Sequence, residues 1–260
     1  MSSAELLEQR LHAGRQTRRF AVAWRNRSRG LIAPVGVLDY EAAGYRFQYL
    51  DSAEQVPGFR PFIGFPDLGR TYTSPRLSPF FGLRVMDPKR PDYGSYLRWL
   101  GLRPDAGRLD VLSRSGGEQK GDSVYLAEEP AVTEDGSTQS IFLLRGASYA
   151  VRAFGAADAA NALVAGDPLH MWNDSDNEAN PAAILLKTTL GRPVGWVPDL
   201  LIDYATAVRD GGGTVTVLQN NGSDAPWHVR FLIQLTGRVE PGLQIYSRPP
   251  WPPRSQAGTT

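Results

Sequence analysis

Residues 20–50 decide the fold class, and they read FAVAWRNRSRGLIAPVGVLDYEAAGYRFQYL. Apolar side chains alternate with polar or small ones in three pieces of this stretch, FAVAW (20–24), VGVLDY (35–40) and YRFQYL (45–50). A period of two is typical of β-strands, and the Gly, Asn and Pro residues between the pieces are typical of turns. The stretch therefore predicts an antiparallel meander.

Helical spacing flanks this meander on both sides. Residues 2–18 predict an amphipathic helix, which opens with a capping box from Ser2 to Glu5. After a stretch rich in Pro and Gly, residues 93–101 repeat their apolar side chains at helical spacing and end at a glycine. A second short helix is expected over residues 107–114.

The segment 128–139, EEPAVTEDGSTQ, is acidic and polar and has no apolar periodicity. Such a composition is typical of a linker between packed units. A chain of 260 residues is also long enough for two ordinary domains. We therefore predict an N-terminal domain over 1–128, a linker over 129–139, a second domain over 140–245 and a Pro-rich tail over 246–260.

Strand and helix patterns alternate in the second domain. Their order predicts an α+β chain, in which a small antiparallel sheet with helices is followed by a twisted β-barrel or half-barrel with two helices. The expected strands are SIFLLRGASYAV (140–151) and residues 168–173, 182–187, 193–197, 213–219 and 227–237, and the expected helices are residues 156–164 and a segment that starts at Asp199.

The bulk composition excludes several classes of protein. The chain has no cysteine, so disulfides, thiolate metal sites and cysteine nucleophiles are excluded. Its N-terminus lacks the apolar core of a signal peptide, and no apolar run is long enough to span a bilayer. We expect a cytoplasmic protein with no membrane partner.

No arrangement of residues predicts catalysis. The histidines His12, His170 and His228 are far apart in the sequence and lack helix-spaced partners. The run GASYA (146–150) lacks the last glycine of a hydrolase nucleophile elbow. We expect no catalytic residue, no metal site, no cofactor and no enzyme activity.

The acidic loop that begins at Asp174 suggests a calcium site, because alternating oxygen ligands are what a calcium loop needs. However, its sixth position is Ala179 where glycine is required, and its twelfth is Leu185 where a bidentate glutamate is required. We interpret the segment as a polar loop between two strands. A metal-dependent hydrolase with carboxylates at Asp174 and Asp176 is the weakest of the alternatives.

Four motifs follow one another in the second domain. They are RGASY (145–149), GDPL (166–169), DNEANPAAI (176–184) and GRPVGWVP (191–198). In this order, over residues 140–240, they resemble a HIRAN domain. The resemblance implies a β-rich module that holds the 3′ end of single-stranded DNA, and hence a non-catalytic nucleic-acid-binding protein.

The resemblance also implies which residues hold the nucleic acid. Tyr149 stands at the position of an aromatic residue that stacks on the terminal base, and Asn180 at the position of an acidic residue that accepts a hydrogen bond from the 3′ hydroxyl. Trp196 stands where the family has Tyr or His, and its ring either stacks on a base or closes the barrel as a half-buried hydrophobe. The implied nucleic-acid-binding residues are Tyr149, Arg145, Asn177, Asn180 and Trp196.

The first domain resembles a different family. The motifs VGVL (35–38), FQYL (47–50), LSPFF (77–81) and YGSYLRWLGL (93–102), followed by residues 112–117, occur in the order found in the N-terminal subdomain of the HipA kinase family. No kinase core follows them. The resemblance implies contact with a protein partner. The alternative function is therefore a bacterial-type, antitoxin-like or defence-system accessory subunit without DNA-end recognition.

The distribution of charge bears on DNA binding. The net charge is +1, yet seven arginines precede residue 30 and are suited to pair with phosphates, unless they form only a solvated basic helix end. Residues 140–260 carry nine Lys and Arg against ten Asp and Glu. We therefore expect modest DNA affinity from the second domain alone.

Overall fold

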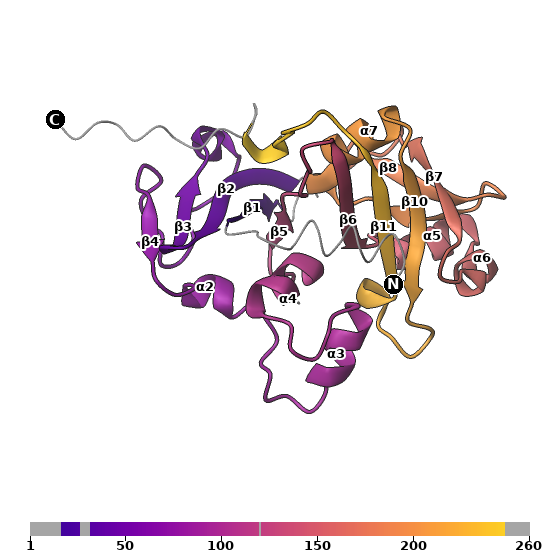
Figure 1. The fold of residues 1–260 in the computed structure, drawn as a ribbon, viewed down its shortest axis with the longest axis horizontal. Coiled ribbons are helices and arrows are strands. Elements are labelled where there is room, and N and C mark those ends of the chain that lie inside the picture. The colour runs from indigo at the N-terminus through magenta and orange to yellow at the C-terminus, as the bar shows by residue number, and fades with distance from the viewer. Residues whose placement is uncertain (1–16, 27–31, 120, 248–260) are drawn as a thin grey trace.

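The computed structural model describes residues 17–26, 32–119 and 121–247, which form two antiparallel β-sheets with helices packed on them (Figure 1). The predicted combination of helices with two antiparallel sheets is confirmed. Of the predicted helix over residues 2–18, residues 2–16 lie outside the described part of the chain. Its last residue, Arg18, begins a strand instead.

The first sheet has the strand order β4-β3-β2-β1-β5. The strands β1, β2 and β3, which follow one another along the chain, form the predicted meander. Their side chains alternate between the two faces of the sheet, so each face receives a row of apolar residues. The strands are β1 (Arg18–Arg25), β2 (Ile32–Glu41), β3 (Gly44–Tyr49), β4 (Tyr72–Ser74) and β5 (Val124–Glu128).

Three helices cover one face of this sheet. They are α2 (Pro79–Gly82), α3 (Tyr93–Trp99) and α4 (Arg108–Ser115), of which α3 and α4 lie where the helical spacing predicted them. Their buried side chains join those of Phe20 and Val22 in one hydrophobic cluster. In Figure 1 all three helices lie below the first sheet.

The second sheet has the strand order β6-β11-β10-β7-β8-β9, and every pairing in it is antiparallel. It curls until its two edges meet. Arg145, just after β6, and Trp196, in β9, exchange backbone hydrogen bonds of 2.9 and 2.8 Å. The strands are β6 (Ser137–Leu143), β7 (Pro168–Asn173), β8 (Ile184–Thr188), β9 (Pro193–Trp196), β10 (Thr214–Asn220) and β11 (Phe231–Arg238).

The second half contains three α-helices in its described residues, where two were expected. They are α5 (Ala147–Phe154), α6 (Ala157–Ala162) and α7 (Ile202–Asp210). The prediction of one continuous strand over 140–151 is wrong, because Gly146 has a φ of 63° and turns the chain into α5. The predicted strand over 227–237 is shortened by a 3₁₀ turn at Trp227–Val229.

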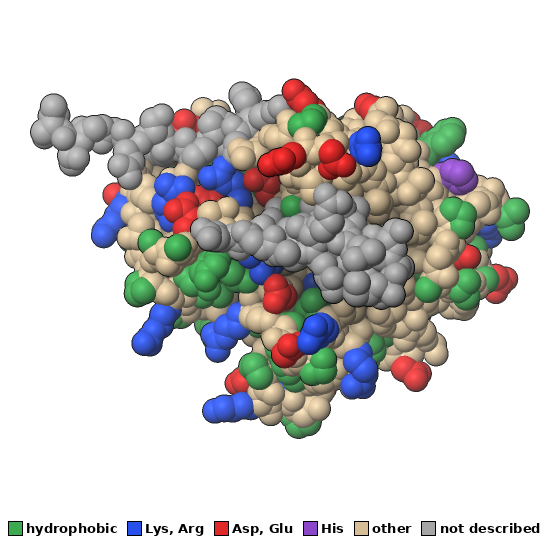
Figure 2. All heavy atoms as spheres, in the orientation of Figure 1, with side chains coloured by type: hydrophobic (Ala, Val, Ile, Leu, Met, Phe, Trp, Pro, Cys, Tyr) green, Lys and Arg blue, Asp and Glu red, His purple; other side chains and the backbone are tan. Residues whose placement is uncertain are grey.

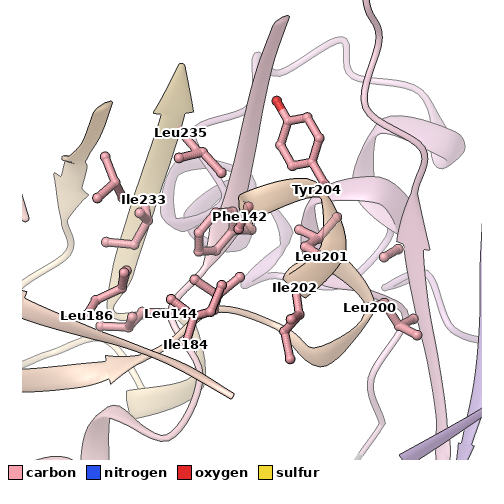
Figure 3. Close-up of a cluster of buried hydrophobic side chains, with 14 of the residues drawn as sticks. Phe142, Leu144, Ile184, Leu186, Leu200, Leu201, Ile202, Tyr204, Ile233 and Leu235 are labelled. Atoms are coloured by element: carbon pink, nitrogen blue, oxygen red, sulfur yellow. The ribbon is translucent and has the colours of Figure 1, made fainter. Parts of the chain in front are cut away.

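The two halves share their hydrophobic cores. Ala21, Ala23 and Val37, on the other face of the first sheet, pack in one cluster with Phe142 and the other side chains inside the curled sheet. Figure 3 shows side chains from the strands, Phe142, Ile184, Leu186, Ile233 and Leu235, together with Leu144 just after β6. They meet Leu201, Ile202 and Tyr204 from the turn before α7 and from α7 itself.

The segments around the expected domain boundaries take part in this packing. β6 begins at Ser137, inside the predicted linker 129–139. Tyr246, in the predicted tail 246–260, is fully buried and its hydroxyl donates to the Leu200 carbonyl at 2.8 Å. Residues from 248 onward lie outside the described part of the chain. The division into domains stays a prediction.

Candidate functional site

Trp196 lies where the two edges of the curled sheet meet, and its ring is held in one orientation. Its Nε1 donates to the Asp174 carboxylate at 2.7 Å. Gly146 packs so closely that a Cβ on it would stand 2.7 Å from Trp196 Cε3. A hydrogen bond at one edge and the backbone against its face therefore fix this indole.

Two rings on α5 lie beside Trp196. The ring centroid of Tyr149 is 5.9 Å from that of Trp196, and the centroid of Phe154 is 6.3 Å from it. α5 buries its small residues, Ala147 and Ala150, and leaves Tyr149 58% and Phe154 44% exposed. The helix thus presents rings to solvent while its alanines approach the sheet closely.

The two predicted asparagines shape the loop between β7 and β8. Asn177 donates to Asp174 at 3.0 Å, and its Oδ1 accepts from the backbone N–H of Ala179 and Asn180 at 3.1 Å each. Asn180 donates to Asp199 at 2.6 Å, and its Oδ1 accepts from the Ala182 N–H at 3.0 Å. An amide oxygen has two lone pairs, so one acceptor position on Asn180 remains for a ligand.

Arg145, the fifth predicted residue, is engaged by the first half of the chain. Its guanidinium forms an ion pair with Glu118, and its Cζ lies 5.9 Å from the centre of the Tyr125 ring. The structure therefore brings Tyr149 and Trp196 together and connects Asn177 to Trp196 through Asp174. Asn180 and Arg145 have partners of their own.

Sequence reasoning missed two carboxylates that organise the site. Asp174 orients Trp196, and Asp199 orients Asn180. From the sequence, Asp174 suggests only a metal ligand, and Asp199 only the start of a helix. Asp199 directly follows the last residue of the fourth motif, which was the one signal that could have drawn attention to it.

The described residues contain neither a metal-binding cluster nor a membrane-spanning helix. In that part of the chain, no three His, Asp or Glu side chains gather in a group that could hold a metal ion. Every helix there is too short or too polar to span a bilayer.

Comparisons with known proteins identify little. No protein-family model and no curated protein matches the chain. Among solved structures, the crystal structure of the HIRAN domain of human HLTF matches with 16% identity and a TM-score of 0.29, covering 40% of this chain and 77% of that one. At this level the match carries no argument about function.

The two family resemblances are affected differently by these comparisons. The HIRAN resemblance continues to depend on its four sequence motifs. None of the comparisons supports the HipA-like resemblance of the first half, which stays a prediction together with the antitoxin-like or defence role.

Proposed function

We propose that the curled sheet binds single-stranded nucleic acid, in particular the 3′ end of DNA, and that the protein is a binding protein without catalytic activity. One observation carries the proposal: the exposed ring of Tyr149 lies beside Trp196, whose indole is oriented by Asp174. Stacking on an aromatic side chain contributes roughly 1–3 kcal/mol per base. The pre-oriented indole of Trp196 reduces the entropy lost when a base binds.

Asn180, in the loop between β7 and β8, suits a terminal hydroxyl. The free lone pair of Asn180 Oδ1 can accept from a 3′ hydroxyl, while Asp199 holds the amide in place. The order of the four motifs around these residues adds support from the HIRAN resemblance.

The charge of the second half indicates weak electrostatic attraction, because residues 140–260 carry nine Lys and Arg against ten Asp and Glu. On the face that Figure 2 shows, acidic and basic side chains are mixed outside the grey region. Few phosphates would then be neutralised, so the salt dependence of binding should be shallow. Stacking, rather than charge, is expected to supply most of the affinity.

The proposal is tested by titrating fluorescent single-stranded oligonucleotides that end in 3′-OH or 3′-phosphate, and a blunt duplex, into wild type and Tyr149→Ala. We expect the 3′-OH strand to bind most tightly and the variant to lose about tenfold in affinity. Ile63→Ala, which truncates an exposed apolar side chain in the first half, is the control and should bind as wild type does.

Two results would contradict this proposal. Equal binding of all three DNAs would show that the protein does not recognise a 3′ end. Unchanged binding by Tyr149→Ala would show that the pair of Tyr149 and Trp196 is not part of the binding site. The thermal transition of Tyr149→Ala should match that of wild type, since the exposed ring contributes little to stability.

A second candidate is a protein partner bound through the first half, as the alternative function requires. Ile63 and Leu83 are exposed by 90% and 72%, and both belong to that half. Isolated exposed apolar residues are common, so the pair gives this candidate only a starting point. A partner that co-purifies after nuclease treatment and is lost in the double variant Ile63→Ser, Leu83→Ser would favour it.

A further inference from the structure

A cavity of about 420 Å³ lies between the first sheet and the start of α5. Arg25 of β1 and Tyr125 of β5 line it from the first half, and Arg145, Ser148, Asp199 and Trp227 line it from the second. Binding pockets for small organic ligands typically have volumes of ~300–1,000 Å³. The cavity is therefore large enough for a small molecule, and both halves are needed to form it.

Two arginines and two carboxylates line the cavity, namely Arg25, Arg145, Glu118 and Asp199. The guanidinium carbons of Arg25 and Arg145 lie 5.0 and 5.9 Å from the centre of the same Tyr125 ring. Glu118 forms an ion pair with Arg145, but Arg25 has no carboxylate partner within the described ranges. A guanidinium without a carboxylate partner beside a cavity is suited to an oxyanion.

The start of α5 adds hydrogen-bond donors to the same space. Ala147 and Ser148 line the cavity, and among the described residues no acceptor is found for either backbone N–H. The first N–H groups of a helix point outward and carry partial positive charge, which favours a phosphate group. The Arg25 guanidinium and the first N–H groups of α5 thus offer an anion hydrogen-bond donors from two different elements.

The remaining lining groups suit the rest of a nucleotide. Asp199 uses one carboxylate oxygen, Oδ1, to accept from Asn180, and its other oxygen, Oδ2, can accept from a sugar hydroxyl. One face of Trp227 is covered by Arg230, whose Cζ lies 3.7 Å from the ring centre, and the indole also lines the cavity. Burial and the Glu118 charge raise the pKa of Tyr125, so its hydroxyl remains a donor.

We propose that this cavity binds the phosphate monoester of a nucleotide, with the phosphate between Arg25 and the start of α5 and the sugar towards Asp199. The site is separate from the ring pair of Tyr149 and Trp196, and neither Tyr149 nor Trp196 lines the cavity. A free nucleoside monophosphate and the 5′-phosphorylated end of a strand share this chemistry. The cavity requires residues of both halves, so a bound ligand would hold the two halves together.

Isothermal titration calorimetry of the full chain tests the proposal with adenosine monophosphate, adenosine and inorganic phosphate as probes. We expect the monophosphate to bind at least about tenfold more tightly than adenosine, because a charge-assisted contact to phosphate is lost in the nucleoside. Arg25→Gln should weaken the monophosphate by about tenfold, while Arg103→Gln, which alters an arginine with an 86% exposed side chain outside the cavity, should not.

Oligonucleotides with and without a 5′-phosphate distinguish the two sources of the ligand. An Arg25-dependent preference for the phosphorylated strand, or Arg25-dependent binding of the free monophosphate, supports the site. Equal affinity for adenosine and its monophosphate together with no 5′-phosphate preference overturns it. Tyr149→Ala should leave monophosphate binding unchanged, so failure of the ring-pair proposal and failure of this one give different results.

Discussion

Two groups of aromatic rings in this protein have similar geometry and opposite exposure. In the first sheet, Phe47 lies 4.7 Å from Phe65 and 5.3 Å from Phe81, measured between ring centroids, and it is 2% exposed. On the second sheet, Tyr149 lies 5.9 Å from Trp196 and is 58% exposed. Ring contacts alone therefore do not separate a core from a binding surface; solvent exposure does.

The buried group is enclosed by a loop that is fastened to the sheet. The Tyr49 hydroxyl accepts from the Phe62 N–H at 2.7 Å and donates to the Phe65 carbonyl at 2.9 Å. Burial raises the pKa of Tyr49, in keeping with its enclosed position. No comparable cover lies over Tyr149 in the described part of the chain, so its ring can contact a ligand.

The largest expected difference between the two groups is in stability. Phe47→Ala should lower the free energy of unfolding by about 3–5 kcal/mol, because a buried ring leaves a cavity when it is removed. Phe154→Ala, in the exposed group, should lower it by less than about 1 kcal/mol. Urea denaturation of both variants measures the difference, and equal losses would contradict the contrast between the groups.

A smaller effect is expected where the backbone supports Trp196. Gly146→Ala places a Cβ 2.7 Å from Trp196 Cε3 at a φ of 63°, so both backbone strain and a clash follow. Gly155→Ala is a matched control, because its φ is 59° but no heavy atom lies within 4 Å of the added Cβ. We expect a loss of about 2–3 kcal/mol for Gly146→Ala and about 1 kcal/mol for Gly155→Ala.

Trp fluorescence adds a second measurement to this pair of variants. The emission of Trp196 should change in Gly146→Ala, since the ring must move to admit the methyl group, and should stay unchanged in Gly155→Ala. Equal destabilisation by the two substitutions would show that the close approach of Gly146 to Trp196 does not matter.

The elements whose side chains repeat with a regular period could be predicted from the sequence. An element whose start depends on a single residue could not. The meander over 20–50 and the helices α3 and α4 were recognisable because many side chains repeat each pattern. The start of α5 was missed because one glycine, Gly146, turns the chain into the helix, and the apolar residues on both sides of it fit either structure.

The site was predicted in part, for a related reason. Tyr149 and Trp196 came from motif order, and the structure places their rings together. The carboxylates of Asp174 and Asp199 act through contacts over 22 and 19 residues of sequence, which no local pattern records. The pairing of Arg145 with Glu118 joins the two halves of the chain and was equally invisible.

The smallest expected effect concerns the hydrogen bond that orients the exposed ring pair. Asp174→Ala removes the acceptor of Trp196 Nε1 and of Asn177 Nδ2, and should lower the free energy of unfolding by about 1 kcal/mol. Asp176→Ala is the control from the same loop, because Asp176 makes no hydrogen bond or ion pair within the described residues.

The same substitution tests whether Trp196 must be held in place to stack on a base. If it must, Asp174→Ala should also weaken single-stranded DNA binding by a few fold, which is about half of the binding free energy that Tyr149→Ala is expected to lose. Wild-type DNA affinity in Asp174→Ala would mean that the Trp196 ring reaches its binding position without the Asp174 carboxylate. The exposed pair of Tyr149 and Trp196 would then bind DNA without a hydrogen bond that orients it.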